Sequence, residues 1–219
     1  MDQQLTNLLI KGFTETIYMT LASSVIAYIF GLPMGVFLVI TSKGHILENK
    51  TINKVLGTFI NIIRSVPFLI LLIAVIPITR FITGTTLGST ATIVPLVIGS
   101  APFIARLVES SLKEVDPGII EAAHSMGAST MQIILKVLLP EATPSLIQGA
   151  AIAITTILGY SAMTGFVGGG GLGDLAIKYG YYRYQTNIML ITVILLVVIV
   201  QFFQEVGIKM ATVSDKRQR

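Results

Sequence analysis

The chain has 219 residues, 53% of them hydrophobic and 12% charged, with a formal net charge of +4 at pH 7. In a soluble domain about a quarter of all residues are charged, and polar surface is needed to cover the core, so this composition excludes an ordinary soluble fold. The sequence has no cysteine, which excludes disulfides, thiol catalysis and cysteine metal sites. The positive charge forms no basic stripe with interleaved aromatic residues, so no nucleic acid partner is expected. No metal site is expected either.

Charged residues are absent from four long stretches of the sequence. These stretches lie between Glu15 and Lys43, between Arg80 and Arg106, between Glu141 and Asp174, and between Arg183 and Glu205. Each exceeds the roughly 20 residues that cross a bilayer as a helix. We therefore predict an all-α membrane protein. Five transmembrane helices are expected in a domain at 17–204, the second of which contains Arg64 and lies outside the four charge-free stretches. The spans are expected at about 17–40, 55–79, 88–107, 143–165 and 184–204.

The ends of the chain flank this predicted domain. Residues 1–16 are expected to be an external segment rather than a cleaved signal, because three charged residues interrupt any short apolar core. Residues 205–219 are expected to form a cytoplasmic tail.

Lysine and arginine residues indicate the orientation of the spans. With the N-terminus outside, the cytoplasmic segments carry ten of these residues and the external segments carry four. The positive-inside rule therefore predicts an external N-terminus and a cytoplasmic C-terminus. The long loop at about 108–141 is then cytoplasmic.

The first three spans contain residues that are unusual in a membrane helix. Kinks or breaks are predicted at the cluster of Gly31, Pro33 and Gly35 in the first span. They are also predicted at four prolines in the next two spans: Pro67, Pro77, Pro95 and Pro102. Arg64 interrupts the second span near the cytoplasmic leaflet, where it can snorkel or pair with a neighbouring segment. We favour a structural role for Arg64.

The loop at 108–141 contains the start and stop signals of two short helices. Asp116 is a good N-cap and Pro117 suits the first helical position, so the first helix is predicted to run to about Met126. Gly127 can then adopt the left-handed C-cap conformation. Ser129 followed by Gln132 fits a capping box that opens a second helix, which is expected to run through Leu139 and end at Pro140.

Helices of about ten residues are marginal alone in water, so these two need a surface on which to dock. Ala122, Ala123 and Gly127 are small and allow a partner to approach the backbone closely. Ile119, Ile120 and Met126 offer apolar contacts. The alternative is an amphipathic helix that lies on the membrane.

The spacing of residues in this loop resembles that of a known family. The pattern resembles the EAA loop of type I ABC importer permeases. It consists of Glu121-Ala122-Ala123, then Gly127 after three residues, and then Val137-Leu138-Leu139-Pro140 after nine more. That family usually has isoleucine at the position of Val137. The resemblance implies that this loop is a coupling helix seated in a cleft of an ATP-binding subunit, with Glu121, Ala122, Ala123, Gly127 and Pro140 as the coupling residues.

Further segments resemble the permeases of methionine importers. They are Arg64–Phe68, Ala101–Arg106, Gly159–Met163 and Gly170–Gly173. The resemblance implies a homodimer in the bacterial cell membrane, multi-pass, with two ATP-binding ABC subunits and an external substrate-binding lipoprotein as partners. It also implies that this chain is not an enzyme and holds no cofactor, with ATP and magnesium in the partner ATPase. The absence of a Gly-x4-Gly-Lys-Ser/Thr motif agrees with this expectation.

The external end of the fourth predicted span carries Tyr160, Ser161 and Met163. An intramembrane serine protease would need a base near Ser161, and the only two histidines fall on the cytoplasmic side, so we reject that reaction. The three residues are expected either to line a translocation path or to pack between membrane helices. Our hypothesis is that Met163 seals the external side of the path, with packing alone as the open alternative.

Six glycines between Gly165 and Gly173 follow this end of the span. The segment lacks the strand, lysine and hydroxyl of a phosphate-binding loop. We expect a flexible or partly re-entrant external loop.

The expected function is that of the permease subunit of an ATP-driven amino-acid importer, with methionine as the expected substrate. One alternative is a permease for another small amino acid or related substrate. A self-sufficient secondary transporter is a different class, and ion coupling would require buried carboxylates or histidines in the spans. The sequence shows none at mid-membrane and no internal inverted repeat.

Overall fold

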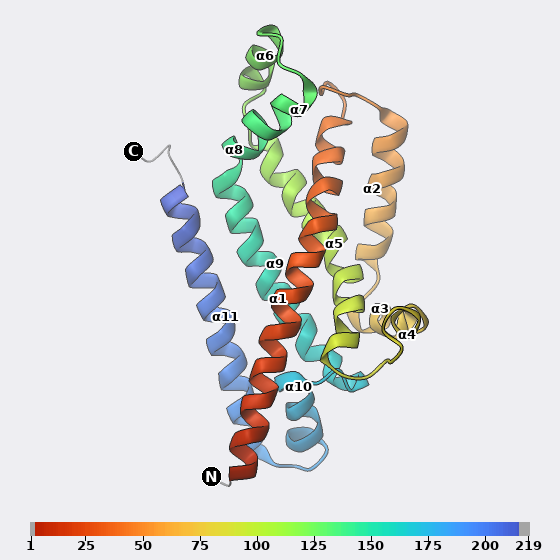
Figure 1. The fold of residues 1–219 in the computed structure, drawn as a ribbon, viewed down its shortest axis with the longest axis vertical. Coiled ribbons are helices and arrows are strands. Elements are labelled where there is room, and N and C mark those ends of the chain that lie inside the picture. Colours follow the sequence, from red (N-terminus) through yellow and green to blue (C-terminus); the bar gives the residue numbers. More distant parts are fainter. Residues whose placement is uncertain (1–2, 215–219) are drawn as a thin grey trace. The chain divides into compact units, whose positions relative to one another are not determined.

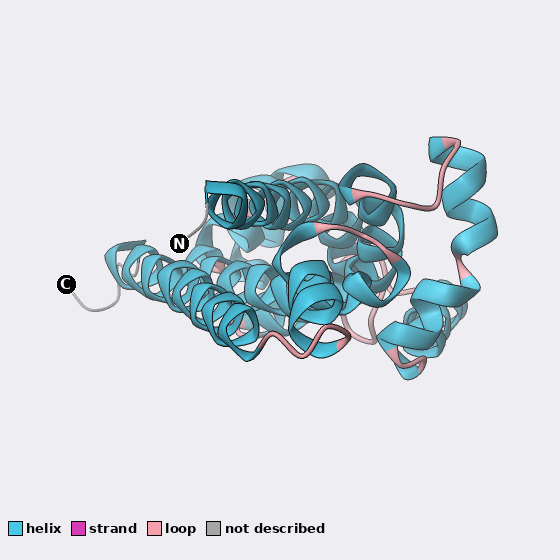
Figure 2. Ribbon diagram, turned by 90° about the horizontal axis from the view of Figure 1, so that it is seen from below, coloured by secondary structure: helices cyan, strands magenta, loops and turns pink. Residues whose placement is uncertain are grey.

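Every regular element in residues 3–214, the part of the chain that the computed structural model describes, is helical (Figures 1 and 2). The long helices are α1 (Gln3–Ile40), α5 (Ser89–Lys113), α9 (Thr143–Met163) and α11 (Thr186–Ser214). The shorter helices are α2 (Lys50–Ser65), α3 (Phe68–Ala74), α4 (Ile76–Thr83), α6 (Pro117–Ser125), α7 (Thr130–Ile133), α8 (Leu139–Glu141) and α10 (Gly171–Leu175). The predicted all-α class is confirmed.

Four helical stretches are long and apolar enough to cross a bilayer: Gln3–Ile40, Ser89–Lys113, Thr143–Val167 and Thr186–Ser214. Helices α2 and α3 qualify together as a fifth span, but they are bent by 100°. The chain is therefore a multi-pass membrane protein, with four unbroken candidate spans and one broken one within residues 3–214.

The second expected span, over 55–79, is divided at Pro67, where a kink or break was predicted. Helix α2 ends at Ser65 and α3 begins at Phe68, and a further helix, α4, starts at Ile76. Pro67 has no backbone N–H and disfavours the helical conformation in the residue before it, so the helix stops there. Pro67 is instead the N-cap residue of α3, with ψ of 134°.

The described residues form two compact units. One unit takes the described part of Met1–Ala27 with Val66–Ser100 and Ala153–Gln204. The other takes Tyr28–Ser65, Ala101–Ile152 and the described part of Glu205–Arg219. We call these the first and the second unit.

The core of the first unit brings together residues that are far apart in the sequence. Its buried residues are Leu9, Leu158, Leu172, Leu175 and Ile199. They come from α1, α9, α10 and α11, and α10 lies beside the N-terminal part of α1 (Figure 1). Burial of apolar side chains thus holds α10 in place, although it has only five residues.

The second unit has a core of Leu38, Ile60 and Ala105. Within it, α1 and α5 approach so closely that a Cβ atom at Gly31 would lie 2.8 Å from the carbonyl oxygen of Ala101. A Cβ at Gly35 would lie 2.6 Å from the carbonyl oxygen of Ala105. Of the kink or break predicted at these glycines, a break is not found, because α1 is continuous. The glycines allow close helix contact.

Candidate functional site

Helices α6 and α7 follow one another across a corner (Figure 1). Local hydrogen bonds fix the shape of this corner. Oδ1 of Asp116 accepts a hydrogen bond of 2.8 Å from the N–H of Gly118, which caps α6 as predicted. Gly127 has φ of +79°. Its N–H donates to the carbonyl oxygen of His124 at 3.0 Å, and the N–H of Ala128 donates to that of Ala123 at 3.1 Å. These two bonds form a Schellman motif, the helix ending that favours glycine.

The second half of the corner opens with the predicted capping box. The N–H of Ser129 donates to Oε1 of Gln132 at 2.8 Å, and the N–H of Gln132 donates to Oγ of Ser129 at 3.4 Å. This helical segment was predicted to end at Pro140, and it ends one residue later, at Glu141. A π-helical turn at Ile134–Leu138 leads into α8, where Pro140 occupies the first turn and needs no N–H donor.

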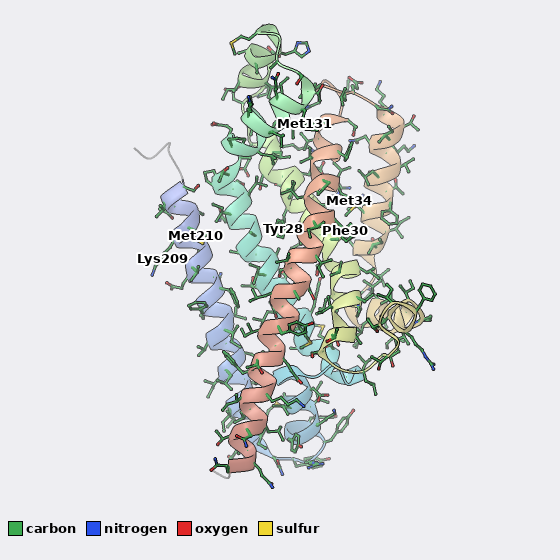
Figure 3. The ribbon with its side chains drawn as sticks, in the orientation of Figure 1. Tyr28, Phe30, Met34, Met131, Lys209 and Met210 are labelled. Atoms are coloured by element: carbon green, nitrogen blue, oxygen red, sulfur yellow. The ribbon has the colours of Figure 1, made fainter. Side chains whose placement is uncertain are left out.

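The surface of the corner is largely apolar and lies open. Met126 is 81% exposed and Met131, which extends from α7 (Figure 3), is 62% exposed. Glu121, Ala122, Gly127 and Pro140 are also exposed. Ala123, in contrast, is buried within the second unit, so among the small residues Ala122 and Gly127 are the ones on the open face. Flexible methionine side chains can adapt to the surface of a partner.

A charged network lies on α5 just before this loop. Nη2 of Arg106 donates to the carbonyl oxygen of Gly57 at 3.1 Å and to Oδ1 of Asn61 at 2.8 Å. Nη1 of Arg106 pairs with Glu109, which also accepts a bond of 2.7 Å from Lys113. The network joins α2 to α5 and neutralises the buried Glu109 carboxylate.

Sequence reasoning missed this network because Arg106 and Lys113 were counted only as topology signals. The i, i+3 and i, i+4 spacing of Arg106, Glu109 and Lys113 was the available signal, since such residues face each other on a helix. Arg64, which was expected to pair or snorkel, is exposed at the end of α2.

The three residues predicted at the external end of the fourth span point in different directions. Ser161 is 1% exposed, and its Oγ donates to the carbonyl oxygen of Leu158 at 2.7 Å. Tyr160 stacks on Phe68, with ring centroids 4.2 Å apart and planes 5° from parallel. Met163 is 43% exposed, and a Cβ at Gly159, one turn earlier, would meet nothing within 4 Å. Gly159 and Met163 therefore mark an open face of α9, whereas Ser161 faces the interior of the chain.

The glycine segment after α9, expected to be a flexible or partly re-entrant loop, is folded into helical turns. A 3-10 turn at Thr164–Val167 precedes α10, and every residue of α10 is buried. The glycines allow tight turns and close backbone contact here.

Comparison with known proteins gives consistent matches over most of the chain. A family model described as "binding-protein-dependent transport system inner membrane component" matches residues 27–206. The probable D-methionine transport system permease protein MetI of Vibrio cholerae serotype O1 (strain ATCC 39315 / El Tor Inaba N16961) is 50% identical over 212 residues, which are 97% of this chain and 94% of that protein. The methionine import system permease protein MetP of Bacillus subtilis (strain 168) is 46% identical over 203 residues, which are 93% of this chain and 91% of that protein.

The fold is also similar to a solved structure. A chain from the native CY5 crystal form of the MetNI methionine ABC transporter, described as inward facing, superposes with a TM-score of 0.97 and 45% sequence identity. The match covers 99% of this chain and 100% of that one.

Proposed function

Because the chain belongs to the family of binding-protein-dependent transport system inner membrane components, we propose that it is the permease subunit of an ATP-driven methionine importer. The observation that carries this proposal is the likeness to methionine permeases over nearly the whole chain, at 46–50% identity. A permease provides the path for the amino acid and performs no chemistry on it. ATP is hydrolysed in a separate subunit of the same transporter.

The corner between α6 and α7 is the site at which this chain engages the ATPase subunit. It presents Glu121, Met126 and Met131 to a partner, and its shape is fixed by the Asp116 cap, the Schellman motif and the capping box. A rigid corner can transmit the closure of the ATPase as a push on α5 and α9, which lie on either side of it in the chain. The Arg106 network extends that push to α2, because it ties α2 to α5.

Two copies of the chain form the path around a two-fold axis. The open face of α9 at Gly159 and Met163 faces that axis, and the two Met163 side chains close the external end of the path. Methionine fills irregular gaps without fixing one geometry, which suits a plug that must open and close. Tyr160 lies beside this plug and Ser161 secures it from the interior of the chain.

The N-terminus lies outside the cell membrane and the C-terminus inside, which places the α6–α7 corner in the cytoplasm. The count of positive charges supports this orientation. An external substrate-binding lipoprotein delivers methionine to the outward-facing dimer. ATP binding produces the outward-facing state, and hydrolysis restores the inward-facing one.

The proposal is tested by purifying the tagged chain in detergent from its native membrane and identifying the proteins that co-purify. We expect an ABC-type ATPase in equal amount to this chain. A Glu121→Lys variant should lose the ATPase, and Glu205→Lys, the same charge change on exposed α11, should retain it. Recovery of the chain without any ATP-binding protein, or equal recovery with both variants, would contradict the proposal.

A further inference from the structure

Helix α10 begins without a cap of its own. Its N-cap residue is Gly170, which has no side chain to accept the first backbone N–H groups. Gly168, Gly170 and Gly171 all have positive φ angles, of 75°, 81° and 78°. Only glycine adopts such a run of left-handed conformations without strain, so the tight turn that aims α10 depends on these three residues.

Helix α1 supplies the missing cap from a distant part of the sequence. Oε2 of Glu15 accepts a hydrogen bond of 2.8 Å from the N–H of Gly171. Oγ of Thr16 accepts one of 2.8 Å from the N–H of Leu172 and itself donates to the carbonyl oxygen of Gly12 at 2.9 Å. Gly171 and Leu172 are buried, so without these two acceptors their N–H groups would have no ready access to water.

The opposite side of α10 presses against the end of α9. A Cβ atom at Gly173 would lie 2.7 Å from the carbonyl carbon of Ala162, and one at Gly165 would lie 2.6 Å from the backbone nitrogen of Asp174. The two backbones are thus in direct contact, with no side chain between them to absorb a displacement. A movement of α10 must move Ala162 and Gly165 as well.

Met163 lies between these contact points. Its neighbour Thr164 is held in place because its Oγ donates to the carbonyl oxygen of Ser161 at 2.6 Å and its carbonyl oxygen accepts from Gly169 at 2.9 Å. Met163 is the exposed residue in this buried frame, at 43%. The position of its backbone is therefore set by α10, and through α10 by α1.

We propose that Glu15 and Thr16 are positioning residues for the external end of the translocation path: they cap α10 and thereby fix where Met163 stands. The effect on transport rests on the proposed permease function, whereas the effect on geometry does not. The two residues touch neither substrate nor gate. They act through α10.

The geometry is tested with Met163→Cys as a reporter, because the chain has no native cysteine. The reporter chain is purified with its ATPase subunit, and labelling by a membrane-impermeant maleimide is followed with and without the α1 substitutions. Glu15→Ala removes one cap and Thr16→Val removes the other while keeping the side-chain shape. We expect each to change the labelling rate of Met163→Cys several-fold.

Two matched variants separate the cap from the charge. Glu15→Gln keeps an oxygen acceptor and should restore a rate close to that of the unsubstituted reporter. Lys11→Ala removes the 3.8 Å ion pair with Glu15 but leaves the cap, and should change nothing. Thr16→Val preserves the test if Glu15→Ala fails to fold.

A second reporter distinguishes positioning from general loosening. Tyr181→Cys lies in the same unit on a side chain that is 63% exposed. A parallel change at both reporters, or an unchanged rate at Met163→Cys with only a lower melting temperature, would overturn the positioning role. If the unsubstituted protein does not take up methionine, the proposed function is contradicted, but the labelling result still stands.

Discussion

Gly127 offers the sharpest test of whether the corner between α6 and α7 binds the ATPase subunit. Its φ of +79° is a conformation that L-residues avoid, and an added Cβ would meet nothing within 4 Å. Substitution therefore introduces backbone strain and no steric clash, which isolates the effect of conformation. The strain is about 1–2 kcal/mol for an L-residue such as alanine, more for a β-branched residue and less for asparagine.

This strain has a definite expected effect on ATPase binding. If the corner must keep its shape to dock, 1–2 kcal/mol corresponds to a loss of affinity of roughly five- to thirty-fold. We expect the loss to increase in the order Gly127→Asn, Gly127→Ala, Gly127→Val. The affinity of each purified variant for the isolated ATPase subunit can be titrated in detergent, and methionine uptake should fall in the same order.

Gly57→Ala provides the matched control. Gly57 lies inside α2 in an ordinary helical conformation, and an added Cβ would lie 3.5 Å from Nη2 of Arg106, a normal contact. Alanine at this position should leave ATPase binding unchanged, since it favours a helix over glycine. Wild-type affinity in Gly127→Val, or a weaker complex with Gly127→Asn than with Gly127→Val, would refute the reasoning.

Three further predictions concern the capping box, the gate and the orientation. Ser129→Ala removes half of the capping box, so the free energy of ATPase binding should become less favourable by about 1 kcal/mol. Gln132→Ala should act in the same direction, and unchanged titrations would show that the box is dispensable for docking. Met163→Ala should fold and should either leak methionine or hydrolyse ATP without transport. Lower thermal stability, with ATP hydrolysis still coupled to transport, would assign Met163 to packing. An impermeant thiol reagent on intact cells should label Gln4→Cys and Tyr181→Cys but not Ser129→Cys, and the reverse pattern would overturn the orientation.

The geometry of the corner between α6 and α7 could be predicted from sequence because its determinants are local. Asp116, Gly127 and Ser129 each act on backbone groups within a few residues, so the rules for helix ends apply directly. The membrane class was equally accessible, since it depends on the distribution of charge along the chain.

The remaining features depend on contacts between distant segments, which a single sequence does not reveal. Glu15 and Thr16 cap residues that lie 156 positions further along the chain. Gly31 and Gly35 were interpreted as marking a kink or break in α1, and the sequence did not reveal that they allow the close approach of α5. Proline was also ambiguous: Pro33 lies within the continuous α1, whereas Pro67 ends α2.

Uptake of methionine into proteoliposomes is the most direct test of the proposed function. The vesicles should contain the purified chain and its ATPase subunit, with the external binding protein on the substrate side and ATP on the ATPase side. Methionine should accumulate only when ATP is present, and Glu121→Lys should abolish accumulation while the chain remains inserted. Accumulation driven by an ion gradient without the ATPase, or no ATP-dependent uptake by the complete system, would contradict an ATP-driven methionine permease.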